Sequence, residues 1–194
     1  MSTGLDSKDL ERLLTAVGDL LADAGSEISI VVVGGATLGI MGWVSRTTHD
    51  VDVIAQAERR GDKWILTDPH PLPPELTEAV GIVARDFNLP RDWLNAEIGD
   101  QWSRGLPPGT VEGLSWRTYE ALHVGFAGRS TLIALKLFAA VDQGPSSVHF
   151  QDLTAMNPTP EEIRDVRKWV LSQDSGEVFP ALLDQLISTL NDPR

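Results

Sequence analysis

Apolar residues recur at helical spacing near the start of the chain and then give way to runs typical of strands. Between residues 10 and 21, leucines and valines recur three and four positions apart. This spacing predicts an amphipathic helix that packs on a sheet. Asp6 or Ser7 can serve as the N-cap of this helix, and Gly25 can end it. The β-branched run after it predicts a buried strand over residues 28–33.

Strand and turn signals continue through the middle of the chain. We expect a short helix from near Thr37, a strand over residues 50–55 and a hairpin turn at residues 59–62. The prolines at 71–74 predict the start of a helix with one apolar face. The remaining elements expected in this region are extended segments over residues 93–98 and between Trp116 and Val124.

From Ser130 onward the apolar spacing is helical. The expected helices are 131–141, 147–156, 160–171 and 179–190. Thr159 and Glu162 form a capping-box pattern around Pro160, which fixes the start of the third of these helices. The predicted fold class is α+β, with a mixed-sheet N-terminal lobe over residues 1–127 and an all-helical C-terminal lobe over 128–194.

Composition narrows the function classes. Of 194 residues, 42% are hydrophobic, which is enough for a sizeable core. The formal charge of -12 argues against nucleic-acid binding over the whole surface and leaves a local basic patch open. The candidate basic contacts are Arg59, Arg60, Lys63, Arg85, Arg91, Arg117 and Arg129. The absence of cysteine excludes disulfides and thiolate chemistry, and no apolar run reaches bilayer length, so we expect a cytoplasmic protein.

A glycine pair follows the strand predicted at 28–33. Gly34 and Gly35 allow a sharp turn that bares backbone N–H groups before the next helix, and such a turn suits a phosphate. Asp50 and Asp52 come next, at the start of the strand predicted at 50–55. The strand period of two places both carboxylates on one face, where they can hold Mg²⁺ together with substrate phosphates. A phosphate site beside a metal site predicts phosphoryl or nucleotidyl transfer.

These motifs resemble the nucleotidyltransferase superfold, which is polymerase-beta-like. Gly34-Gly35-Ala36-x-Leu38, Gly42, and Arg46-x-Thr48-x-Asp50-Val51-Asp52-Val53 resemble more closely the AbiEii/MenT group of bacterial toxin nucleotidyltransferases. That resemblance implies a lysine and a later aspartate from the helical lobe, matched here by Lys136 and Asp152. It also implies transfer of NMP from NTP to the 3′ end of tRNA, which blocks translation, and a cognate antitoxin that can be kinase-like and modify Thr48.

Several site residues have a structural alternative. Lys136 is the only charged residue between Thr131 and Val141, so it either snorkels to the surface or meets an anion in a cleft. Asp152 can orient Lys136, act as a base, or simply end a helix. Ser45 and Arg46 are candidates for the outer phosphates, although Arg46 can instead cap the short helix. Thr48 can be an ordinary strand threonine.

Other residues are weaker candidates. Glu97 is a possible third carboxylate, and Trp102 beside Arg104 is the best candidate for stacking on a base. His49 alternates away from Asp50 and is expected to be a packed or surface histidine.

The favoured hypothesis is a Mg²⁺-dependent NTP:tRNA nucleotidyltransferase with catalytic Asp50, Asp52, Lys136 and Asp152. One alternative is a nucleotidyltransferase acting on a small molecule, such as an aminoglycoside, or on a protein, which the negative charge favours. A second is a non-catalytic nucleotide-binding module, which fits poorly because the chain lacks G-x-G-x-x-G.

Overall fold

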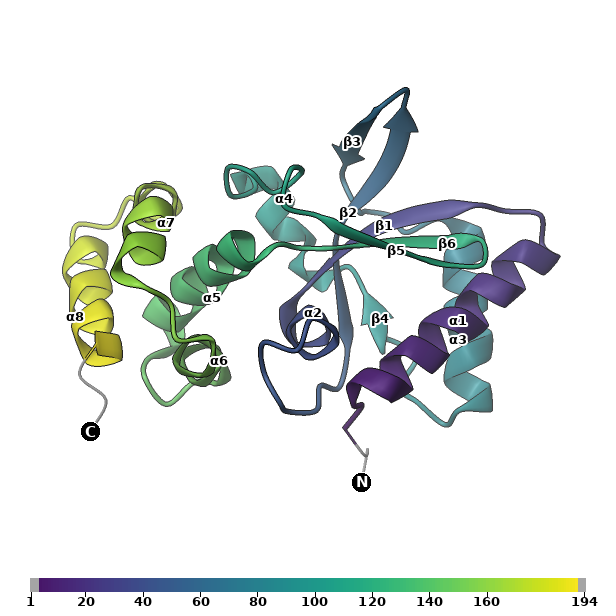
Figure 1. Ribbon diagram of the computed structural model, residues 1–194, viewed down its shortest axis with the longest axis horizontal. Helices are drawn as coiled ribbons and strands as arrows, with labels where there is room; N and C mark the ends of the chain where they lie inside the picture. The colour runs from purple at the N-terminus through teal and green to yellow at the C-terminus, as the bar shows by residue number, and fades with distance from the viewer. Residues whose placement is uncertain (1–3, 192–194) are drawn as a thin grey trace. The chain divides into compact units, whose positions relative to one another are not determined.

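The computed structural model (Figure 1) describes residues 4–191, apart from the side chains at positions 99 and 100. The described chain divides into two compact units. The first lies within Met1–Gly105 and Leu114–Ala127, and the second within Leu106–Gly113 and Gly128–Arg194.

A mixed sheet forms the centre of the first unit. Five of its strands lie side by side in the order β3-β2-β1-β6-β5, and the short strand β4 also pairs with β2. The central strand β1 runs antiparallel to β2 and parallel to β6. The strands are β1 (Ile28–Val33), β2 (Val51–Arg60), β3 (Lys63–Thr67), β4 (Leu94–Asn95), β5 (Ser115–Tyr119) and β6 (Leu122–Phe126).

Two helices cover one face of this sheet. Helices α1 (Ser7–Asp23) and α3 (Pro74–Asp86) contact each other, and Figure 1 shows them side by side. Their apolar stripes share one core with Ile30, Val32 and Phe126, which point to this face. Asp6 caps α1 and forms a capping box with Asp9. The opposite face of the sheet carries Asp52, and it is the face on which the candidate chemistry lies.

Short helices complete the first unit. Helix α2 (Gly34–Ile40) follows β1 directly, and η1 (Glu97–Gly99) and α4 (Asp100–Arg104) follow β4. Helix α2 therefore begins three residues before the predicted Thr37. Glycines have low helix propensity, so the pattern alone placed the start too late.

The second unit is helical. Helix α5 (Arg129–Gln143) contacts α6 (Val148–Met156), α7 (Pro160–Ser172) and α8 (Phe179–Asn191). The segment Leu106–Gly113 belongs to this unit as well, although it comes earlier in the chain. Its buried Thr110 hydroxyl lies 3.2 Å from the hydroxyl of Thr131, in the first turn of α5.

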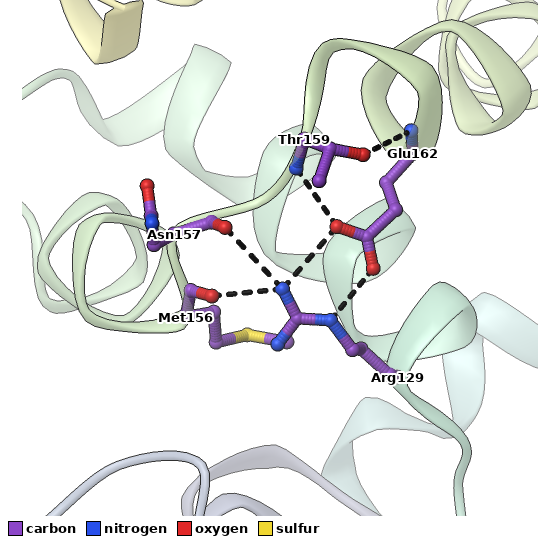
Figure 2. A network of polar contacts seen from close by, with 5 residues as sticks. All are labelled: Arg129, Met156, Asn157, Thr159 and Glu162. Carbon is purple, nitrogen blue, oxygen red and sulfur yellow. Dashed lines mark hydrogen bonds and ion pairs between the residues drawn. The ribbon is translucent and has the colours of Figure 1, made fainter.

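One arginine ties three of these helices together (Figure 2). At the start of α5, Arg129 makes a two-point ion pair with Glu162 of α7, at 2.6 and 3.2 Å. It also donates to the carbonyl of Met156 at the end of α6, at 2.8 Å. Glu162 completes the predicted capping box with Thr159. The Arg129 hydrogen bonds, with those from Thr159, hold the pKa of Glu162 below its usual value.

The predicted α+β fold is confirmed by this architecture. Three strand predictions need correction. The segment expected to be extended over residues 93–98 is the short strand β4 followed by η1, and the single segment expected between Trp116 and Val124 is the hairpin β5–β6. Strand β2 begins at Val51, so Asp50 lies just before it, and it extends to Arg60 instead of ending at residue 55. Within the described residues, no helix is both long enough and apolar enough to cross a membrane.

Candidate active site

The site begins at the turn from β1 into α2. Gly34 has a φ of +72°, a conformation that favours glycine because a Cβ would clash with the backbone. The buried hydroxyl of Thr37 donates to the carbonyl of Val32 at 2.9 Å. This hydrogen bond ties the first turn of α2 to the end of the strand.

Asp52 lies against this turn. It is opposite Val33 in the β1–β2 register, and its carboxylate approaches Gly34 closely. A Cβ added to Gly34 would lie 2.2 Å from Oδ2 of Asp52. Glycine at position 34 therefore lets the carboxylate of Asp52 lie directly against the turn, where any other side chain would clash with it.

The second glycine, Gly35, lies just as closely against the loop before β2. A Cβ at Gly35 would lie 2.7 Å from the hydroxyl of Thr48 and 3.1 Å from Nη2 of Arg46. The Thr48 hydroxyl donates to Oδ1 of Asp50 at 3.2 Å. Gly34 thus contacts Asp52, and Gly35 lies beside the residue that holds Asp50. The structure brings together five of the sequence-predicted residues at this turn, which are Gly34, Gly35, Arg46, Thr48 and Asp52, with Asp50 joined through Thr48.

Thr48 is not part of a continuous strand. It forms an isolated antiparallel bridge with Leu5, with backbone hydrogen bonds of 2.7 and 3.0 Å. Its side chain is buried. Thr48 is thus held by the segment before α1, and its hydroxyl faces Asp50.

The carboxylates Asp50 and Asp52 can supply oxygen ligands for Mg²⁺, which commonly takes one or two carboxylates with phosphates and water. Among the described residues, no three His, Cys, Asp or Glu side chains cluster as a complete metal site. Asn95 lies opposite Asp52 in the β2–β4 pairing, and Glu97 beyond it is exposed.

Lys136 and Asp152 form a buried ion pair in the second unit. Nζ of Lys136 lies 2.8 Å from Oδ2 of Asp152, and their side chains are 8% and 1% exposed. Nδ1 of His149 lies 3.4 Å from the same Nζ. Lys136 therefore does not snorkel to the surface, and the orienting role considered for Asp152 has the contact that it requires.

The weaker candidates are dispersed. Ser45 and His49 are exposed, and Trp102 is a half-buried residue of α4.

Several of the candidate basic residues are ion-paired: Arg60 with Glu58, Arg85 with Asp86, Arg117 with Glu11 and Arg129 with Glu162. Pairing of this kind reduces the positive charge that these side chains offer to a polyanion.

Sequence reasoning missed an aromatic pair on the sheet. The rings of Trp64 in β3 and Trp116 in β5 stack with their centroids 3.8 Å apart. Trp64 follows the predicted hairpin turn and Trp116 begins a predicted extended segment, but their 52-residue separation gave no sign that they meet.

Comparison with known proteins bears on the first unit. Residues 8–64 match the family model described as Nucleotidyltransferase of unknown function (DUF6036). This segment contains the glycine turn, Asp50 and Asp52, and ends in β3, so it includes the geometry described above. The match supports a nucleotidyltransferase, and the α+β fold is consistent with one. No curated protein and no solved structure matches the chain significantly.

Proposed function

We propose that the protein is a Mg²⁺-dependent nucleotidyltransferase that transfers NMP from NTP to an acceptor and releases pyrophosphate. The observation that carries the proposal is the close approach of Gly34 to Asp52, which places a carboxylate directly against the glycine turn. The nucleotidyltransferase family match over the same residues supports it.

The chain's own groups have distinct parts in this proposal. Asp50 and Asp52 would hold Mg²⁺, which when bound neutralises charge on the triphosphate. The Thr48 hydroxyl orients Asp50 through its hydrogen bond. Arg46, whose guanidinium lies beside Gly35, supplies positive charge toward the outer phosphates. Ser45 is exposed on the same loop and offers a hydroxyl for these phosphates.

Lys136 and Asp152 are proposed as further catalytic residues. A lysine held at 2.8 Å by a buried carboxylate keeps its position and charge, and a positioned cation can stabilise the charge that develops on the phosphates. Asp152 orients this lysine.

The proposed acceptor is the 3′ end of tRNA, so that the protein acts as a translation-blocking toxin. This assignment comes from the resemblance to the AbiEii/MenT group. A cognate antitoxin, acting as a kinase on Thr48, is the proposed regulator. Phosphate on Thr48 would place negative charge beside Asp50, where the triphosphate must bind.

A second candidate acceptor is a cationic small molecule or a protein. The net charge of -12 and the ion pairing of Arg60, Arg85, Arg117 and Arg129 favour it over a polyanion.

An acceptor screen decides between these candidates. The purified protein is incubated with α-labelled NTPs and Mg²⁺, and separately with total tRNA, an aminoglycoside mixture or cell protein. Label in tRNA supports the toxin proposal, and label only in small molecules or protein supports the second. Absence of label in every acceptor contradicts nucleotidyl transfer.

A further inference from the structure

The stacked pair Trp64–Trp116 joins the two ends of the sheet. Strands β3 and β5 stand at opposite ends of the strand order, and in a flat sheet four intervals of about 4.8 Å would separate them. Their rings nevertheless stack at 3.8 Å, with 18° between the planes. The sheet must therefore curl over this face, and the register shift at Val31/Val32 contributes, because bulges increase local twist.

A glycine makes room for this arrangement. A Cβ added to Gly125 of β6 would lie 3.0 Å from the ring of Trp116. The indole of Trp116 thus lies flat across the neighbouring strand. Both tryptophans stay half-buried, so part of the aromatic surface faces solvent.

The pair borders a groove of about 660 Å³, a size within the range of small-molecule sites. The polar side chains that line it are Glu27, Ser29, Glu58, Arg59, Thr118 and His123, and Glu58 is paired with Arg60. Ser29 and Thr118 lie opposite His123 in the two strand pairings, so these three residues form one row across β1, β6 and β5. We name this site the tryptophan groove.

A chain of hydrogen bonds determines which atoms of this row donate a proton and which accept one. Nε2 of His123 lies 2.8 Å from a carboxylate oxygen of Glu27, and Nδ1 lies 3.0 Å from the hydroxyl of Thr118. The carboxylate can only accept, so Nε2 carries the proton. In the neutral imidazole Nδ1 then accepts from Thr118. The hydroxyl oxygen of Thr118, which is exposed, is left as an acceptor for a ligand.

We propose that the tryptophan groove binds a nucleobase that carries an exocyclic amino group. Indole faces stack on bases, and here the face of Trp64 turned away from Trp116 would take the base. The Thr118 oxygen accepts from an amino N–H, which cytosine and adenine have and uracil lacks. Arg59 at the margin adds a positive charge suited to a phosphate. The base can come from a free nucleotide or from a nucleic-acid strand.

The place of the groove favours a strand. Ala57 of the groove lies five residues beyond Asp52 on β2, roughly 16 Å along the strand. That separation is longer than one nucleotide, so an acceptor strand whose end is at Asp52 would have an upstream base in the groove. The preference for a strand over a free nucleotide is the one part of the proposal that rests on the proposed function.

The test is a binding titration without NTP or Mg²⁺, in which binding is measured by tryptophan fluorescence and by calorimetry. The probes are the tetraribonucleotides C4 and U4, with CMP to separate a free nucleotide from a strand. We expect C4 to bind more tightly than U4, by about two- to tenfold for one hydrogen bond. Tighter binding of C4 than CMP supports a strand as the source, and equal binding supports a free nucleotide.

Variants locate the binding. Because Trp116 lies between Trp64 and Gly125, the base is expected to stack on Trp64. Trp64→Leu is therefore expected to weaken C4 binding about 5- to 150-fold, the range for loss of one stacked base, whereas Trp43→Leu, in the turn after α2, leaves it unchanged. Thr118→Val is expected to remove the preference for C4 over U4, and Thr118→Ser to retain it. Because Thr118 is exposed, these two variants are expected to fold even if Trp64→Leu does not.

Two results would overturn the proposal. One is no binding of C4 or CMP by the wild-type protein. The other is a C4 preference unchanged in Thr118→Val. Since neither measurement involves transfer, a protein that binds C4 but transfers no NMP would overturn only the proposed function.

Discussion

Gly34 approaches Asp52 so closely that a Cβ at position 34 would lie 2.2 Å from the carboxylate oxygen Oδ2. The contact couples the strand-to-helix turn to the acid that follows it in β2. Two elements that are 18 residues apart in sequence thereby form one site. The functional proposal depends on this close approach of the carboxylate to the turn.

A Gly34→Ala substitution tests the contact. The alanine would have to adopt a φ of +72° and would push against Asp52, so we expect loss of nucleotidyl transfer and a lower melting temperature.

Gly42→Ala is its matched control. Gly42 has the same φ of +72°, but a Cβ there meets no atom within 4 Å. We expect it to cost about 1 kcal/mol of unfolding free energy and to leave transfer at the wild-type level. Equal transfer by the two alanine variants would show that the close approach of Asp52 to the turn at Gly34 is not needed for transfer.

The buried pair Lys136–Asp152 gives a second prediction. In Lys136→Met the carboxylate of Asp152 loses its partner while 1% exposed, so we expect the variant to lose about 3–5 kcal/mol of unfolding free energy. The double variant Lys136→Met/Asp152→Leu removes both charges and is expected to regain most of this stability.

Activity of the double variant separates structure from catalysis. If the pair acts in the reaction, the stable double variant transfers no NMP. Wild-type transfer by a folded double variant would assign the pair to stability alone.

The Arg129–Glu162 pair predicts an acid-sensitive second unit. In the folded protein the pKa of Glu162 is lowered from its usual value of 4.5, chiefly by the hydrogen bond from Arg129. The pair therefore stabilises the folded state above about pH 4.5, and this stabilisation is lost as the pH falls through the lowered pKa. Glu162→Gln is expected to melt lower than wild type at pH 7 and to lose less stability on acidification. Thermal melts between pH 7 and pH 3 check this. Parallel curves for the two proteins would contradict it.

Thr48 carries the prediction on regulation. Thr48→Glu is expected to depress transfer strongly because it places a charge beside Asp50, whereas Thr48→Ser keeps the hydroxyl and retains activity. A kinase must first reach this buried hydroxyl, so the bridge to Leu5 has to open. Hydrogen exchange at the amide of Thr48 measures that opening. Wild-type transfer by Thr48→Glu would remove Thr48 as a switch.

Local signals in the sequence predicted local structure well. The capping box at Thr159 and Glu162 is confirmed because it depends on four consecutive residues. The strand β2 was predicted too short because its second half is polar, and pairing with β3 holds it as a strand. Tertiary pairing can override composition in this way.

The candidate site was predictable only in part. The glycine pair and the two aspartates are neighbours in a short motif, and their proximity could be expected. The pairing of Lys136 with Asp152 needed a helix-to-helix contact, and the stacking of Trp64 on Trp116 needed the curl of a whole sheet. Neither depends on residues that are close in sequence.

The most direct test of the central claim is NMP incorporation by Asp52→Asn. Asparagine keeps the size of the side chain and removes the charge that would hold Mg²⁺, and Asp62→Asn in the exposed β2–β3 turn is the control. With α-labelled NTP, Mg²⁺ and the acceptor found in the screen, we predict that Asp52→Asn lowers incorporation by about 10²-fold or more while melting like wild type. Wild-type incorporation by a folded Asp52→Asn protein would contradict the account.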